Sequence, residues 1–168
     1  MRTTLDALAP TFVATAHRIG IAVVATVDGA GEPRTRVMQP VWEWDGATLT
    51  GWASTEAGAT KVADLARLPV LSLTYWDATQ DTCTADCTAE RVTGAADRAA
   101  AWDRFLATPP PAGFDPAIHP EWESAASPGF AVLRLRPHRL RTMPGSLMTS
   151  GEGEVLTWSA PGRASGGG

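Results

Sequence analysis

Residues 47–76 read ATLTGWASTEAGATKVADLARLPVLSLTYW, and they contain the clearest local signals of secondary structure in the chain. The apolar run at 47–53 has the composition of a strand, and a loop of small residues follows at 54–60. Apolar residues then recur at helical spacing over 60–68, until a proline ends the helix and a second apolar run begins at 70–76. The stretch therefore predicts a strand, a loop, a helix and a buried strand.

Lys61 opens the predicted helix and is the only lysine in the chain, beside 13 arginines. An ammonium group next to the free backbone N–H groups of a helix N-terminus suits a phosphate. The alternative is an ordinary solvated lysine in the first turn of a surface helix.

Two arginines, Arg34 and Arg36, alternate on a predicted strand and so point to one face of it. A charged strand edge that resists aggregation is the alternative explanation. Together with Lys61 they form a candidate phosphate cradle. Its hydroxyl groups would come from Ser54, Thr55 and Thr60.

The remaining pattern predicts a mainly β chain with a few inserted helices, a barrel or a sandwich whose strands are largely antiparallel. One domain would cover residues 1–160, followed by a disordered tail at 161–168. Further strands are expected at 20–27, 33–44, 82–93, 130–135, 138–143 and 154–158. Further helices are expected at 5–18, interrupted by Pro10, and at 95–107.

Composition excludes several classes of protein. The net charge is −4 and charged residues make up 19% of the chain, which argues against nucleic-acid binding. No apolar run of about 18 residues is present, and the first residues lack a signal-peptide pattern. We therefore expect a cytoplasmic protein with neither a nucleic acid nor a membrane as its partner.

Two cysteines, Cys83 and Cys87, lie four residues apart in a predicted strand. That spacing puts them roughly 13 Å apart, too far for a disulfide, so we expect buried free thiols. No histidine lies close enough in sequence to complete a metal site, and none is expected.

Residues 108–128 are rich in proline but also carry Phe114, Ile118 and Trp122, which a disordered linker would seldom combine. An irregular segment of this length is usually functional. We expect it to fold over the binding site and shape a substrate pocket. His119, within the segment, is the best candidate among the histidines for a substrate contact.

These motifs together resemble the FMN-binding split β-barrel of the pyridoxamine 5′-phosphate oxidase-like superfamily. The resemblance rests on the GEPRTRV stretch at 31–37, the Asp45-Gly46 turn, the Ser/Thr loop before Lys61, and LPVLSL at 68–73. It extends over roughly residues 17–143, and it implies a homodimer with cofactor sites at the interface.

The resemblance also implies roles for individual residues. Lys61 and Arg36, with Arg34 as a second choice, would bind the FMN phosphate. The ring system and ribityl chain would lie along the strands and the start of the helix. The residues implied there are Val37, Met38, Trp52, Ala53, Ser54 and Thr60.

The chain lacks the Arg-x-His substrate motif of the true oxidases, so we do not expect a pyridoxamine phosphate substrate. We predict an FMN-dependent oxidoreductase that acts on a small, planar molecule, and we assign no catalytic residue. The alternatives are a deazaflavin-dependent reductase of the same fold and a non-catalytic flavin- or haem-binding protein.

Overall fold

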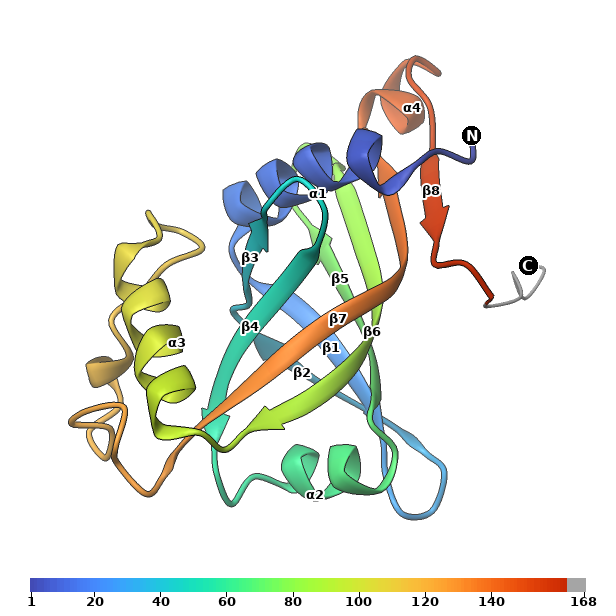
Figure 1. The fold of residues 1–168 in the computed structure, drawn as a ribbon. Helices are drawn as coiled ribbons and strands as arrows, with labels where there is room; N and C mark the ends of the chain where they lie inside the picture. Colours follow the sequence, from blue (N-terminus) through green and yellow to red (C-terminus); the bar gives the residue numbers. More distant parts are fainter. Residues whose placement is uncertain (163–168) are drawn as a thin grey trace.

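The structure, a computed structural model, describes residues 1–162, and residues 163–168 of the predicted tail lie outside the described part. Eight strands form one sheet, with helices around it (Figure 1). The strands are β1 (Ala22–Val27), β2 (Pro33–Met38), β3 (Val41–Trp44), β4 (Leu49–Glu56), β5 (Val70–Trp76), β6 (Thr82–Val92), β7 (Phe130–Met143) and β8 (Leu156–Ser159). The helices are α1 (Leu5–Ile19), α2 (Thr60–Arg67), α3 (Ala95–Ala107), the 3-10 helix η1 (Pro116–Ile118) and α4 (Ser146–Thr149).

The sheet is antiparallel and follows the order β2-β1-β5-β6-β7-β4-β3, with β8 paired to β7. The long strands β6 and β7 bend around the molecule, as Figure 1 shows. The two end strands, β2 and β3, do not pair with each other, so the barrel is split. The predicted fold class is confirmed.

Helix α1 closes one end of the barrel over the main core (Figure 1). Phe12 of α1 is fully buried and meets Trp42 edge-on, with ring centroids 5.0 Å apart. The indole of Trp42 donates a hydrogen bond to the Tyr75 hydroxyl at 2.9 Å. Pro10 does not interrupt α1, contrary to prediction, because the buried face of the helix outweighs one lost backbone hydrogen bond.

A second core lies between the sheet and α3. Phe105 of α3 is fully buried there, beside Trp122 and Phe130. Trp122 belongs to residues 108–128, called the wall segment below. The segment packs on α3, because the Phe105 and Phe114 rings lie 5.2 Å apart and the Phe114 N–H donates to the Phe105 carbonyl oxygen. The buried aromatic side chains hold the wall segment against the barrel.

Most strand boundaries shift by one or two residues from prediction, and three differences change the pairing. The strand expected at 33–44 is divided at Pro40, so β2 pairs with β1 whereas β3 pairs with β4 at the other end of the sheet. The break expected at Pro137 is absent, because an extra residue in β7 shifts the register there. Strand β4 continues through residues 54–56, which were predicted as loop, because they pair with β7.

Cys83 and Cys87 are buried and free, as predicted. Burial raises the pKa of both thiols. Among the described residues, no helix is long and apolar enough to cross a membrane.

Candidate functional site

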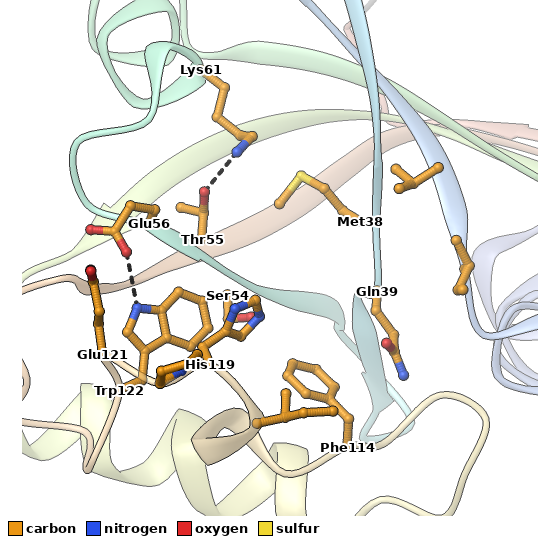
Figure 2. Close-up of a pocket in the computed structure, with 14 residues that line it drawn as sticks. Met38, Gln39, Ser54, Thr55, Glu56, Lys61, Phe114, His119, Glu121 and Trp122 are labelled. Carbon is orange, nitrogen blue, oxygen red and sulfur yellow. Dashed lines mark hydrogen bonds between the residues drawn. The ribbon is translucent and has the colours of Figure 1, made fainter.

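A cavity of about 630 Å³ opens between the barrel and the wall segment (Figure 2). Residues 37–39 at the end of β2 and residues 54–56 at the end of β4 form its barrel side. Lys61 lies at one end, and Phe114 with residues 118–122 forms the opposite side, called the outer wall below. The cavity therefore joins the predicted phosphate site to the predicted substrate segment.

Lys61 points into this cavity from the first turn of α2 (Figure 2). Its Nζ donates a hydrogen bond to Oγ1 of Thr55 at 2.8 Å, and it forms no ion pair with any residue of 1–162. Burial, and then the positive charge of Arg36, hold the pKa of Lys61 below its ordinary value. An anion in the cavity would relieve this unfavourable charge.

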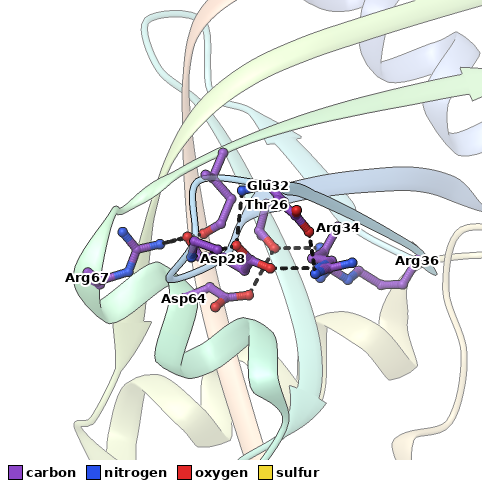
Figure 3. Close-up of polar contacts among 9 residues, drawn as sticks. Thr26, Asp28, Glu32, Arg34, Arg36, Asp64 and Arg67 are labelled. Atoms are coloured by element: carbon purple, nitrogen blue, oxygen red, sulfur yellow. Dashed lines mark hydrogen bonds and ion pairs between the residues drawn. The ribbon is translucent and has the colours of Figure 1, made fainter.

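Arg36 lies on the same sheet face as the buried Val24, its register partner on β1. Its Nη1 donates to Oγ1 of Thr26 at 2.8 Å and to the Val24 carbonyl oxygen at 3.4 Å (Figure 3). Thr26 donates onward to the buried carboxylate of Asp64, on α2, at 3.5 Å. Burial lowers the pKa of Arg36, and the charge of Asp64 opposes this shift. The guanidinium of Arg36 is thus hydrogen-bonded through Nη1 alone.

Arg36, Lys61 and Thr55 form one corner of the site, and their hydrogen-bonding groups suit a phosphate dianion. Within the described chain, Arg36 forms no ion pair, and its Nε and Nη2 make no hydrogen bond. Two neighbouring cations without a carboxylate in contact repel each other, and a shared phosphate would remove that repulsion. The hydroxyl of Thr55 adds a further hydrogen-bonding group beside Lys61.

Arg34 is not part of this corner. Its Nε donates to Asp28 at 2.8 Å and its Nη2 to Glu32 at 2.7 Å, so it stabilises the β1–β2 turn (Figure 3). The backbone N–H of Glu32, followed by Arg34, holds the pKa of Asp28 below its usual value. Arg67 donates to the Asp28 carbonyl oxygen from the other side. The two arginines therefore differ: Arg34 forms ion pairs within the turn, whereas Arg36 lies close enough to Lys61 for their charges to interact.

Of the other predicted cofactor residues, some line the cavity and others lie elsewhere. Val37, Met38 and Ser54 line the cavity. Trp52 lies under α3 instead, where its indole donates to Glu43 and the Arg104 guanidinium lies 4.5 Å from its ring centroid. Ala53 is buried in the main core, and Thr60 is exposed at the start of α2.

The outer wall is fixed by contacts that span the chain. The indole of Trp122 donates to the Glu56 carboxylate at 3.1 Å, and its ring lies 4.1 Å from that of His119 (Figure 2). Gln39, at the exit of β2, donates to the Pro111 carbonyl oxygen at 2.7 Å. The wall segment therefore lines the cavity with His119 among its residues, and its placement over a cofactor and a substrate stays a prediction.

Several cavity residues were missed by sequence reasoning. Glu56 was assigned to a loop, although its place at the end of a strand that leads to Lys61 was a usable clue. Nothing in the local sequence marks Ile21 and Gln39, because only the tertiary fold brings them to the cavity. Pro120 and Glu121 lie in the segment expected at the site, but they were not singled out as individual residues.

Comparison with known proteins identifies the family of this chain. A model of the pyridoxamine 5′-phosphate oxidase family matches residues 8–144. No curated protein shows a significant sequence match to the chain.

Solved structures share the fold at low sequence identity. A Clostridium acetobutylicum protein related to general stress protein 26, of the pyridoxinephosphate oxidase family, is similar with a TM-score of 0.65 and 15% identity, over 92% of this chain and 94% of that one. A pyridoxamine 5′-phosphate oxidase-related, FMN-binding protein from Nostoc punctiforme has a TM-score of 0.61 and 15% identity, over 84% of each chain. A NimC/NimA family protein from Clostridium acetobutylicum has a TM-score of 0.64 and 13% identity, over 88% of this chain and 91% of that one.

At these identities the structural neighbours establish the fold alone. The family match is broader evidence, because it spans most of the chain and includes the strands, helix and loop that build the cavity. The chain belongs to the pyridoxamine 5′-phosphate oxidase family.

Proposed function

We propose that this protein binds FMN, with the phosphate of the cofactor held by Arg36 and Lys61. The observation that carries the proposal is a pair of cations that form no ion pair with any described residue. Lys61 lies at one end of the cavity, and Arg36 is close enough to interact with its charge. Val37, Met38 and Ser54 would line the rest of the cofactor. The FMN-binding neighbour from Nostoc punctiforme supports this choice of ligand.

We further propose an oxidoreductase that acts on a small, flat molecule. Bound FMN supplies hydride and electron transfer, and the protein supplies binding, orientation and the surrounding charges. The outer wall would hold the substrate and limit the access of water to it, because Trp122 and Phe114 cover that side of the cavity. This role needs no acid or base from the protein.

The proposal includes a homodimer. Strands β1, β2 and β5 expose apolar side chains on one face, among them Val23 (51% exposed), Val37 (69%) and Trp76 (59%). Val37 also lines the cavity, so the apolar face is continuous with the site. A second copy covering this face would bury the apolar area and complete the cofactor site.

A cytoplasmic location is also part of the proposal. The described residues contain no helix long and apolar enough to cross a membrane, and the sequence begins without a signal-peptide pattern.

The absorbance spectrum of the purified protein tests the identity of the cofactor. We expect a flavin band at about 450 nm that grows to one FMN per chain when FMN is added. A band at about 420 nm would instead identify a deazaflavin, and a Soret band a haem. Light scattering should give the mass of a dimer, and a stable monomer that binds FMN fully would contradict the shared site.

The affinity for FMN should depend on pH through Lys61. Its lowered pKa means that the ammonium loses its proton at a lower pH than a solvated lysine, and the neutral amine cannot pair with phosphate. We expect FMN affinity to fall as pH rises through this lowered pKa. Titrations from neutral pH to about pH 10 measure it, since ordinary lysines titrate near the upper limit.

Linkage gives the opposite trend for the cofactor-free protein. Between the folded and the higher unfolded pKa of Lys61 the unfolded chain binds more protons, so this residue makes the stability rise with pH. The Lys61→Ala variant is the control, and it should lose both trends. An alkaline fall in FMN affinity that persists in the variant would assign the effect to another group.

A further inference from the structure

The charges around the cavity are separated along its length. Lys61 lies at one end, whereas the carboxylates of Glu56 and Glu121 lie on the side of the outer wall (Figure 2). A phosphate bound by Lys61 and Arg36 would neutralise the positive charge at that end of the cavity. The charge left facing the rest of the cavity would then be negative.

The Glu56 carboxylate is held in place at the edge of the cavity. One oxygen accepts the hydrogen bond of the Trp122 indole at 3.1 Å. The other lies against Gly129, where a Cβ atom would approach it to 2.9 Å, so glycine leaves the room that this carboxylate occupies. The hydrogen bond from Trp122 therefore orients the exposed carboxylate of Glu56 at the edge of the cavity.

Glu121 is the second charge, and it has no competing partner. It forms no ion pair and no side-chain hydrogen bond with any residue of 1–162. An exposed carboxylate that lines a cavity without a cationic partner in the protein is available to a ligand.

Flat side chains lie next to these carboxylates. The exposed His119 ring is tilted by 43° against the Trp122 ring, with ring centroids 4.1 Å apart, and Phe114 lies further along the outer wall. A flat ring could stack on this surface, and aromatic faces attract cations. The wall thus combines stacking surface with negative charge.

We propose that the outer wall selects flat heteroaromatic cations that carry no phosphate or carboxylate group. The inference rests on the proposed function, because FMN must first neutralise the positive end of the cavity. Glu121 is the main specificity-determining residue, and Glu56 supports it.

Three probes of one ring system test this selection on the FMN-loaded protein at low salt. They are 1-methylquinolinium, neutral quinoline and quinoline-4-carboxylate, and calorimetry gives the dissociation constant of each. We expect the cation to bind about twofold to fivefold more tightly than quinoline, as for one partly exposed charge contact. The carboxylate should bind most weakly, and added salt should reduce the differences.

Glu121→Gln should remove most of the preference for the cation and leave quinoline binding unchanged. Glu123→Gln is the matched control, because Glu123 is exposed two residues further on and does not line the cavity. The double variant Glu56→Gln with Glu121→Gln should remove the preference for the cation entirely, because both negative charges are lost. The wall should keep its structure, because glutamine still offers an acceptor to the Trp122 indole.

The outcomes separate the two proposals. If the protein binds FMN, three results would overturn the proposed substrate class alone. They are equal affinity for the three probes, no binding of any probe, and an unchanged preference for the cation in the Glu121→Gln variant. Failure to bind FMN would overturn the proposed function, and the substrate class with it.

Discussion

Replacing Lys61 with alanine is expected to weaken FMN binding by about 1–3 kcal/mol, roughly fivefold to 150-fold in dissociation constant. The ammonium is half-buried, carries no ion pair within residues 1–162, and has a pKa that burial and Arg36 lower. Its removal deletes a charge-assisted hydrogen bond to the phosphate and leaves Arg36 alone. Titration of FMN into cofactor-free protein, followed by flavin fluorescence, measures the change.

Arg34→Ala is the matched control for this experiment. It also removes one positive charge, but from the ion pairs with Asp28 and Glu32 in the β1–β2 turn. We expect its FMN affinity to stay within about twofold of the original, because exposed charges at a distance are screened. Equal losses in the two variants would mean that overall charge, not contact, attracts the cofactor.

Replacing Phe105 with alanine should cost about 3–5 kcal/mol of unfolding free energy. Phe105 is fully buried in the second core and packs on Phe114, so its loss opens a cavity between α3, the sheet and the wall segment. Urea unfolding of the cofactor-free protein measures the cost as a shift in the midpoint.

Leu106→Ala provides the comparison, because Leu106 is the next residue of α3 and is 50% exposed. Its effect should stay below about 1 kcal/mol, as for surface substitutions. If both variants shift the midpoint alike, α3 does not pack on the sheet as described.

Local patterns predicted much of the fold. The strand at 70–76 and the helix at 95–107 match β5 and α3 residue for residue, because apolar periodicity and flanking breakers act locally. The break at Pro40 and the continuous strand through Pro137 were not predicted. Both features depend on which neighbouring strand pairs with these residues. Pairing between residues distant in sequence cannot be recognised from a few consecutive residues.

The site was predictable where it rests on a motif. Lys61 stood out by its rarity and its position at a helix start, and the structure places it in the cavity. The family resemblance ranked Arg36 above Arg34, and the structure shows how the two differ, because Arg34 forms ion pairs with Asp28 and Glu32 of the turn. Glu121 had no sequence signature, since its significance arises from the cavity that the wall segment completes.

The wall segment leaves the barrel after α3 and returns at β7. The contacts that hold Lys61 and Arg36 come from β1, β4 and α2, and none of them involves the segment. If FMN is bound as proposed, substitutions at exposed positions of the segment, such as His119 and Glu121, can change the substrate while the residues that bind the phosphate stay the same.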